Sequence, residues 1–268
     1  MTLEPPSEEP TARAPLERES RTVDRAAKWL RNNIKRATPG NTESTPPTPD
    51  STESTPQHRL IVGGLWDTIG PLQFEFIKGR GLEPHHRFLD IGCGALRGGA
   101  HFIDYLEPGG YHGIDRDELT LQAGREQELA PGVEEAKRPT FIVRDDFDFS
   151  RFGTTFDFAL AQSVFTHLYL NSIHRALVNV SSVLADGGVF YATFFENTQG
   201  PTWLEPIVQW PGDEMMKVAP MTTMDADPFH YEFEALEWLA GLAGLRATYV
   251  GDWGHPRNQR MAMFDRVG

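Results

Sequence analysis

The amino-acid sequence predicts an α/β fold: a doubly wound, seven-stranded, mostly parallel sheet with an antiparallel last strand, preceded by a disordered N-terminal tail. Three observations predict it. Apolar runs of strand length alternate with helical segments from Leu60 onward. The first strand, 87–91, leads into Gly92 and Gly94 and then a helix, as in folds that bind a ligand at a helix N-terminus. The last two strands are too close for a crossover helix, so they must form an antiparallel hairpin.

The expected elements follow in order along the chain. A helix over 66–79 opens the domain and is interrupted near Gly70 and Pro71, because proline breaks the hydrogen-bond ladder of a helix interior. Apolar runs bounded by turn residues then place the strands at 87–91, 110–115, 140–144, 156–162, 189–195, 246–252 and 261–264. The helices between them span 95–106, 117–130, 172–184 and 232–243.

Residues 197–228 interrupt this alternation. They contain five prolines and no obvious element, together with Trp203, Trp210 and several methionines. A long insertion in a compact domain is usually functional or disordered. Because aromatic residues and methionines favour burial, we expect a lid over an acceptor site.

The first 57 residues have the composition of a disordered tail, and the folded domain is expected to span 58–268. Segment 38–57 is almost entirely Thr, Pro, Ser, Glu and Asp, which bury no apolar surface. Within the tail, Arg21–Arg36 has apolar residues at helical spacing among basic ones. This pattern fits a short basic amphipathic helix that lies on an anionic membrane or a partner. A marginal, solvated helix is the favoured alternative, because so few apolar residues bury little surface.

Composition restricts the partners and the compartment. The net charge is −13, and acidic residues outnumber basic ones by 29 to 17 after residue 57, so nucleic acid would be repelled. The first residues lack the features of a secretory signal, and no apolar run has the length of a membrane span. The single cysteine, Cys93, forms no internal disulfide and is expected to be a small buried side chain. We therefore expect a cytoplasmic protein.

The glycine turn is the most informative motif. A dinucleotide fingerprint requires a glycine where Arg97 stands, and no phosphate-binding P-loop string occurs. What remains is a strand carrying Asp90, then Gly92 and Gly94, and a second strand that ends in Asp115. This pattern resembles motif I and the following acidic position of the class I S-adenosylmethionine-dependent methyltransferases, in particular a bacterial small-molecule type with an Arg-Gly-Gly extension.

Two further blocks carry the same resemblance. Residues 161–168 are similar to the block after the fourth strand of this family, and residues 184–188 are similar to its turn before the fifth strand, with Asp186 in place of proline. The sequence departs from motif I at Leu96, where the family has a third glycine, and this affects how the loop meets the methionine end of the cofactor. The resemblance covers residues 60–268 and implies the fold and the cofactor, S-adenosyl-L-methionine.

The resemblance also implies roles for residues around the glycine turn. Asp115 would accept both ribose hydroxyls of the cofactor, a bidentate arrangement that suits a carboxylate. Gly92 and Gly94 would let the backbone approach the methionine tail and the ribose. Asp90 would anchor the ammonium group of that tail, directly or through water.

Two residues farther along the chain complete the expected cofactor site. Asp146 would accept from the adenine amino group, with Phe147 packing on the ring; a solvated turn is the alternative for the acidic run 145–148. Gln162 would line the sulfonium. The chain has nine histidines but no metal-ligand spacing, so no metal is expected.

Methyl transfer is an in-line displacement, so alignment contributes most of the catalysis, and a hydroxyl acceptor also gains from a general base. His167, after the fourth strand, is the candidate base, and a capping or packing histidine is the alternative. Glu196, at the end of the fifth strand, and His255 are weaker candidates.

The predicted function is methyl transfer from S-adenosylmethionine to a small or medium-sized acceptor, at an oxygen of a sugar, lipid or natural product. Two alternatives stay open: an N-methyltransferase acting on an amine or a protein, and a non-catalytic cofactor-binding scaffold of the same fold. The intact set of Asp90, Gly92 and Asp115 counts against the scaffold.

Overall fold

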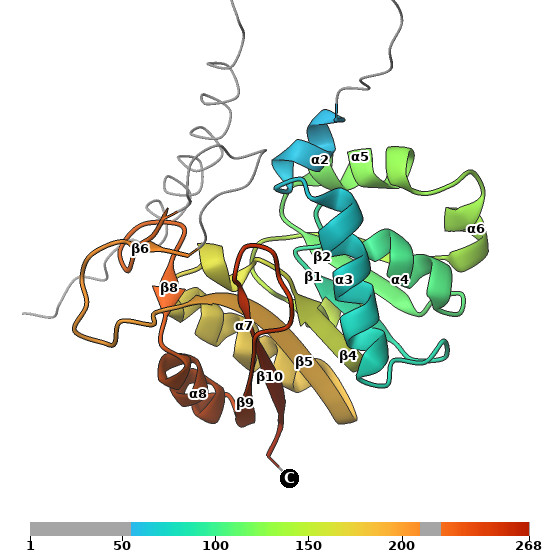
Figure 1. The fold of residues 1–268 in the computed structure, drawn as a ribbon. Helices are drawn as coiled ribbons and strands as arrows, with labels where there is room; N and C mark the ends of the chain where they lie inside the picture. The colour runs from blue at the N-terminus through green and yellow to red at the C-terminus, as the bar shows by residue number, and fades with distance from the viewer. Residues whose placement is uncertain (1–54, 210–220, 268) are drawn as a thin grey trace, which may run out of the picture. The chain divides into compact units, whose positions relative to one another are not determined.

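The computed structural model describes residues 55–209 and 221–267. These residues form a central sheet with helices on both faces (Figure 1), so the predicted α/β fold is confirmed. The tail helix predicted at Arg21–Arg36 and the predicted lid residue Trp210 lie outside the described residues. None of the helices in the two described ranges is long and apolar enough to cross a membrane.

The main sheet has the strand order β3-β2-β1-β4-β5-β10-β9, and the short strand β8 pairs with β5. The strands are β1 (Phe88–Ile91), β2 (Tyr111–Asp115), β3 (Thr140–Val143), β4 (Phe156–Ala161), β5 (Leu184–Glu196), β8 (His230–Tyr231), β9 (Leu245–Gly251) and β10 (Arg260–Arg266). Strand β10 is antiparallel to both neighbours, which confirms the predicted closing hairpin. The eighth strand, β8, was not predicted, because two residues carry no periodicity to recognise.

Strand β1 lies between β2 and β4, and all three are parallel. Ile91 pairs with Ile114, and Asp90 pairs with Leu160. The carboxyl ends of these strands therefore meet at one edge of the sheet, which is where ligands bind in open α/β sheets.

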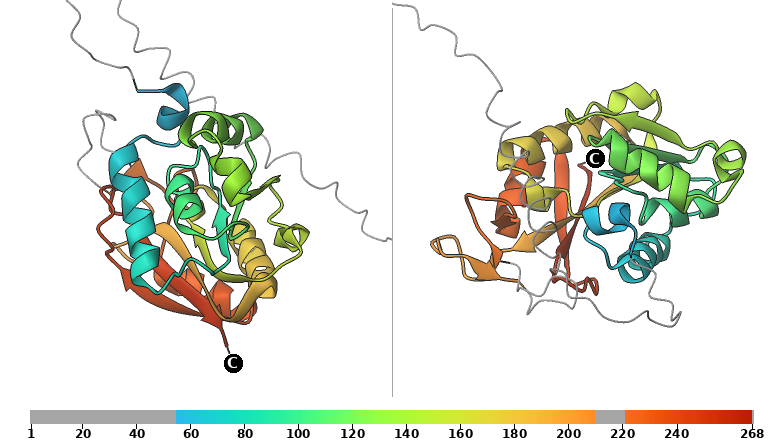
Figure 2. Two further views of the ribbon diagram at one scale, coloured as in Figure 1. Left: turned by 90° about the vertical axis from the view of Figure 1, so that its right-hand side faces the viewer. Right: turned by 90° about the horizontal axis from the view of Figure 1, so that it is seen from above.

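Two apolar cores form on the two faces of the sheet. Helices α3, α4 and α5 contribute to one core, and helices α7 and α8 to the other (Figures 1 and 2). Successive residues of β1 alternate between them, with Phe88 in the first core and Leu89 in the second. The helices are α2 (Gln57–Ile61), α3 (Trp66–Gly79), α4 (Gly99–Tyr105), α5 (Glu118–Glu128), α6 (Val133–Lys137), α7 (Leu170–Val183) and α8 (Phe233–Leu242), with 3-10 turns η2 (Phe149–Phe152) and η3 (Phe165–His167).

The prediction that helix α3 breaks near Gly70 and Pro71 is wrong, because the helix is continuous with Pro71 inside it. A Cβ at Gly70 would lie 2.4 Å from the carbonyl oxygen of Arg97, so this glycine allows the helix to pack closely on the loop before α4. Ile69 and Ile77 of the same helix are fully buried. Tertiary packing thus outweighs the hydrogen bond that proline removes.

Other boundaries move for identifiable reasons. Helix α4 begins at Gly99 rather than at residue 95, because Leu96 adopts a left-handed conformation with φ of +64°. Strand β5 begins at Leu184 rather than at residue 189, and a register shift against β4 absorbs the glycine turn. The insertion 197–228, expected to hold no element, contains the antiparallel strands β6 (Ile207–Val208) and β7 (Met221–Thr222).

Candidate active site

The turn between β1 and α4 is built for a close approach of the backbone. Gly92 has φ of +73° and Gly94 has φ of +52°, conformations that favour glycine. A Cβ at Gly92 would lie 2.5 Å from Cγ2 of Val164. The N–H groups of Gly92 and Cys93 donate to the carbonyl of Ile114 at 2.8 and 3.2 Å, which fixes the turn to the end of β2. Gly92 is exposed, so its backbone is open to a ligand.

Asp115 is the last residue of β2, and its side chain reaches the glycine turn. Its carboxylate accepts the N–H groups of Gly94 and Asp117, each at 2.8 Å. Burial raises the pKa of the Asp115 carboxyl, and these two hydrogen bonds oppose the rise. Each oxygen keeps a further lone pair for a ligand hydroxyl. The structure thus brings together the two parts of the predicted cofactor site.

Asp90 lies on β1, two residues before Gly92, and is 5% exposed. The hydroxyl of Tyr111 donates to its Oδ2 at 2.7 Å. Burial raises the pKa of the Asp90 carboxyl to about 7, and the bond from Tyr111 opposes the rise. A buried carboxylate is costly unless it meets a partner. Asp90 can therefore change its charge state near neutral pH.

Polar side chains gather where β4 and β5 end. Nε2 of Gln162 lies 3.2 Å from Oε1 of Gln259 and 3.2 Å from Nε2 of His255. Oε1 of Gln259 also accepts the hydroxyls of Ser163 at 3.0 Å and Thr193 at 2.7 Å. The side-chain carbonyl oxygen of Gln162, Oε1, is buried without a hydrogen-bond partner in the described structure. Such an acceptor suits a ligand that brings positive charge or a donor.

Residues 57–65, which we call the strap, cover the glycine turn and were not anticipated from the sequence. A Cβ at Gly94 would lie 3.0 Å from Cγ1 of Val62. Nη1 of Arg97 donates to two strap carbonyls at 2.9 Å each, and Nη2 of Arg257 donates to a third at 2.8 Å. Two buried arginines from distant parts of the chain therefore hold the strap against the turn.

The strap is also fixed to α5. The carboxylate of Glu128 accepts Nε and Nη2 of Arg59 at 2.7 and 2.8 Å, and Nε2 of His58 lies 2.5 Å from it. Burial raises the pKa of the Glu128 carboxyl, but these hydrogen bonds outweigh it, so the pKa lies below its ordinary value. The only sequence signal for this segment was the pair of glycines at 63–64.

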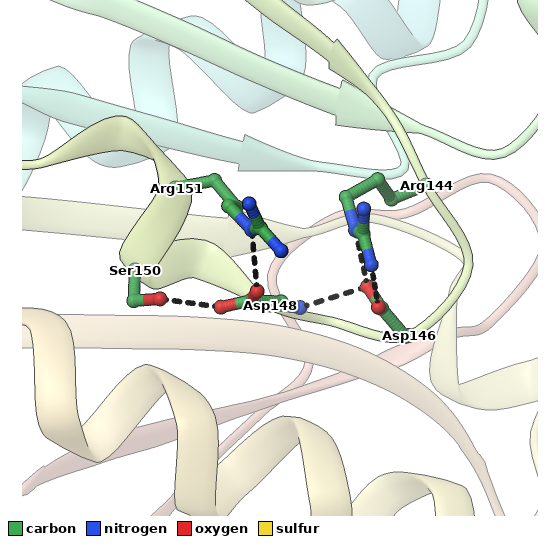
Figure 3. A network of polar contacts seen from close by, with 5 residues as sticks. All are labelled: Arg144, Asp146, Asp148, Ser150 and Arg151. Atoms are coloured by element: carbon green, nitrogen blue, oxygen red, sulfur yellow. Dashed lines mark hydrogen bonds and ion pairs between the residues drawn. The ribbon is translucent and has the colours of Figure 1, made fainter.

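Asp146 follows β3 and forms an ion pair with Arg144 (Figure 3). Nε of Arg144 donates to Oδ1 of Asp146 at 2.8 Å, and Nη2 of Arg144 donates to Oδ2. The Asp148 N–H donates to Oδ1 at 3.2 Å. The bonds from Arg144 lower the pKa of the Asp146 carboxyl. The predicted role toward adenine stays a prediction, and it requires this carboxylate to accept from the adenine as well as from Arg144.

His167 lies at the end of η3 with 57% of its side chain exposed. Its Nδ1 is 2.5 Å from Oδ1 of Asp227, which belongs to the insertion 197–228. The N–H of Phe229, the residue that follows the insertion, donates to the carbonyl of Thr166 at 2.8 Å, so a backbone bond holds the end of the insertion beside η3. Sequence reasoning missed Asp227, because no motif links residues 60 positions apart.

Glu196, the weaker candidate base, has partners on other strands. The hydroxyl of Tyr249 on β9 donates to Oε2 of Glu196 at 2.7 Å, and Nε of Arg260 on β10 lies 3.6 Å from the same oxygen. Burial and the bond to Glu196 raise the pKa of Tyr249 to about 12. The described contacts of Glu196 do not include His167, so the structure does not join the two candidate bases.

The predicted lid residue Trp203 is 40% exposed. In the short hairpin beside it, Ile207 and Thr222 form a buried pair, while Val208 and Met221 form an exposed pair. The described part of the insertion therefore has one anchored face and one open apolar face.

Residues 89–190 match the family model of a methyltransferase domain. Among solved structures, the chain is similar to the CcbJ methyltransferase from Streptomyces caelestis, with 13% identity and a TM-score of 0.57 over 74% of this chain and 90% of that one. It is also similar to magnesium protoporphyrin IX methyltransferase (ChlM) from Synechocystis PCC 6803 with bound S-adenosylmethionine, with 12% identity and a TM-score of 0.56 over 96% of this chain and 100% of that one.

A third similar structure is an S-adenosylmethionine-dependent methyltransferase from Clostridium acetobutylicum ATCC 824, with 13% identity and a TM-score of 0.53 over 78% of this chain and 96% of that one. At these identities the structures establish the fold, and the family match covers the glycine turn, Asp115 and the end of β4. Residues 89–190 thus match a methyltransferase domain, and the chain has the fold of S-adenosylmethionine-dependent methyltransferase structures.

Proposed function

We propose that the protein methylates a hydroxyl group of a small or medium-sized acceptor, such as a sugar, lipid or natural product, with His167 as general base. The observation that carries the proposal is the contact between Nδ1 of His167 and the carboxylate of Asp227. When bound, S-adenosylmethionine supplies a methyl group activated by the adjoining sulfonium.

The chain's own residues fit that cofactor. Gly92 presents exposed backbone, and Asp115 keeps lone pairs for a ribose diol. Asp90 would hold the ammonium group of the methionine tail, where a positive partner would favour its ionised form. The unpartnered side-chain oxygen of Gln162, Oε1, would face the sulfonium of the cofactor.

The pairing of His167 with Asp227 suits a general base. A carboxylate on Nδ1 holds the tautomer in which Nδ1 carries the proton, so the lone pair of Nε2 can accept a hydroxyl proton from the acceptor. The positive charge that then forms on the imidazole is stabilised by the same carboxylate. Because more than half of the His167 side chain is exposed, an acceptor can reach it.

A small acceptor is supported by charge and by the relatives. The acidic composition disfavours nucleic acid. One similar structure is named for magnesium protoporphyrin IX as its substrate, and another is a glycopeptide N-methyltransferase with 13% identity and a TM-score of 0.53. The oriented base favours an oxygen acceptor, because a hydroxyl must lose its proton during transfer whereas a neutral amine attacks before losing one.

The proposal is tested by screening metabolite pools with methyl-labelled S-adenosylmethionine and identifying the product by mass spectrometry. With the acceptor found, His167→Gln should lower kcat by about 10²–10⁴-fold while the dissociation constant of S-adenosylhomocysteine stays unchanged. Asp227→Asn should lower kcat by about tenfold or more. His85→Gln is the matched control, because His85 is an exposed histidine 3.5 Å from the carboxylate of Glu83. Wild-type kcat in His167→Gln would exclude the base, and an N-methylated product would exclude the oxygen acceptor.

A further inference from the structure

Two arginines are buried together in this acidic protein. Arg97 and Arg257 are 8% and 9% exposed. Burial and the positive charge of Arg257 together lower the pKa of Arg97 to about 10, and the nearby Asp90 opposes this fall. Buried cations ordinarily pair with an anion. Nη1 of Arg97 instead donates to two carbonyls, and no carboxylate of the described residues forms an ion pair with this guanidinium.

The guanidinium of Arg97 has an unused edge. Its Nε is buried and has no hydrogen-bond partner within the described residues. Guanidinium groups bind carboxylates through two parallel N–H bonds, and Nη1 is already engaged by the strap. The edge that contains Nε therefore remains for a carboxylate. A buried donor without an acceptor costs free energy, which a ligand that supplies the acceptor would recover.

The arginines are linked to the acceptor side of the sheet. Arg257 and His255 belong to the loop between β9 and β10, and Nε2 of His255 contacts Gln162 at the end of β4. Burial and the two guanidinium groups lower the pKa of His255 to about 3, so its ring is neutral and leaves the positive charge to the arginines. Asp115, expected to hold the cofactor ribose, lies at the end of β2. Strands β2 and β4 flank β1 on opposite sides, so Asp115 and Gln162 lie on opposite sides of β1.

The strap gives a route to the buried edge. Gly63, Gly64 and Leu65 have successive φ values of +89°, +60° and +48°. Three left-handed residues in a row, two of them glycine, form a joint between α2 and α3 that can change conformation at little steric cost. Movement at this joint would separate the strap carbonyls from Arg97.

We propose that Arg97 binds a carboxylate of the methyl acceptor, so that the acceptor class is a hydroxy acid or another carboxylate-bearing alcohol. This proposal rests on the proposed function, because it assigns the acceptor to the same site. The methionine tail of the cofactor is the other source of a carboxylate, and the experiment separates the two.

The first arm uses simple carboxylates as probes. With the full chain saturated with S-adenosylhomocysteine, acetate and benzoate should raise Tm, and acetamide and benzamide should not. Arg97→Gln should weaken carboxylate binding about tenfold or more. Arg246→Gln is the control, because Arg246 is an exposed arginine in an ion pair with Asp265. Carboxylates that behave like their amides would overturn the proposal.

The second arm identifies the source of the carboxylate by calorimetry. Arg97→Gln should lower the affinities for S-adenosylhomocysteine and for 5′-methylthioadenosine, which lacks the amino-acid tail, by the same factor, because it loosens the strap and removes no contact with the tail. If the variant loses affinity for the first ligand alone, Arg97 holds the cofactor tail and the proposal is wrong. If Arg97→Gln fails to fold, Arg97→Lys replaces it, because lysine keeps the positive charge but lacks the paired N–H donors of the guanidinium. A loss of carboxylate binding in Arg97→Lys would support the proposal in the same way. Failure of the wild type to bind S-adenosylhomocysteine would overturn the proposed function instead.

Discussion

Raising the pH from 5 to 8 should destabilise the wild type more than a variant in which Asp90 is replaced by asparagine. The unfolding free energy of the variant, relative to that of the wild type, should therefore be higher at pH 8 than at pH 5. Burial raises the pKa of Asp90 from 3.8 to about 7. The folded state thus holds this proton more tightly than the unfolded state does. The resulting stability is fully present below pH 3.8 and is lost as the pH rises through about 7.

The magnitude follows from the pKa difference. About three pH units at 1.36 kcal/mol each amount to about 4 kcal/mol over the whole range, of which about 2–3 kcal/mol falls between pH 5 and pH 8. Asparagine does not titrate, and its carbonyl oxygen can still accept the Tyr111 hydroxyl that now donates to Asp90. The charged groups nearest to Asp90, including Asp115 and Arg97, are retained in both proteins.

Urea unfolding at the two pH values, without cofactor, measures the effect. The unfolding free energy of Asp90→Asn minus that of the wild type should increase by about 2–3 kcal/mol from pH 5 to pH 8. Asp186→Asn is the control, because the Asp186 side chain is fully exposed. A difference that is the same at both pH values would refute the reasoning that Asp90 is protonated in the folded protein below neutral pH.

Four further outcomes are expected. Gly92→Ala should lower the unfolding free energy by about 1–3 kcal/mol and abolish cofactor binding in calorimetry. Its control is Gly153→Ala, at φ of +65° with open space around it, which should lower the unfolding free energy by less and leave cofactor binding intact. Glu128→Gln should lower unfolding free energy by about 1–2 kcal/mol and speed S-adenosylhomocysteine release in stopped-flow measurements, because it loosens the strap. Asp115→Ala should remove most of the thermal shift that S-adenosylmethionine gives the wild type. A chain beginning at Pro56 should bind cofactor with unchanged affinity, and unfolding of that chain would assign the tail a structural role.

The sequence predicted the parts of the fold that depend on local patterns. The strands that flank the glycine turn carry unbroken apolar runs, and the spacing of the last two strands required a hairpin, which β9 and β10 form. The turn and Asp115 were predicted as one site because a known motif relates them, and their hydrogen bond confirms that they meet.

The features that escaped prediction depend on contacts between distant residues. Asp227 meets His167 across 60 positions, and the insertion that carries Asp227 has no periodicity that fixes its path. The strap is a five-residue helix followed by glycines, which is too short to recognise without the arginines that hold it. Pro71 was misread because a local rule predicted a break, whereas packing against the Arg97 backbone kept the helix whole.

The bond between Arg257 and Gly63 joins residues 194 positions apart. Contacts of this span form late in folding, because the chain between their ends must first be ordered. The loop that carries Arg257 connects β9 to β10, and β10 lies between β5 and β9 in the sheet. During synthesis, the strap and the glycine turn therefore emerge long before the residue that ties them together, and a chain stalled before β10 would display the motif without a completed site.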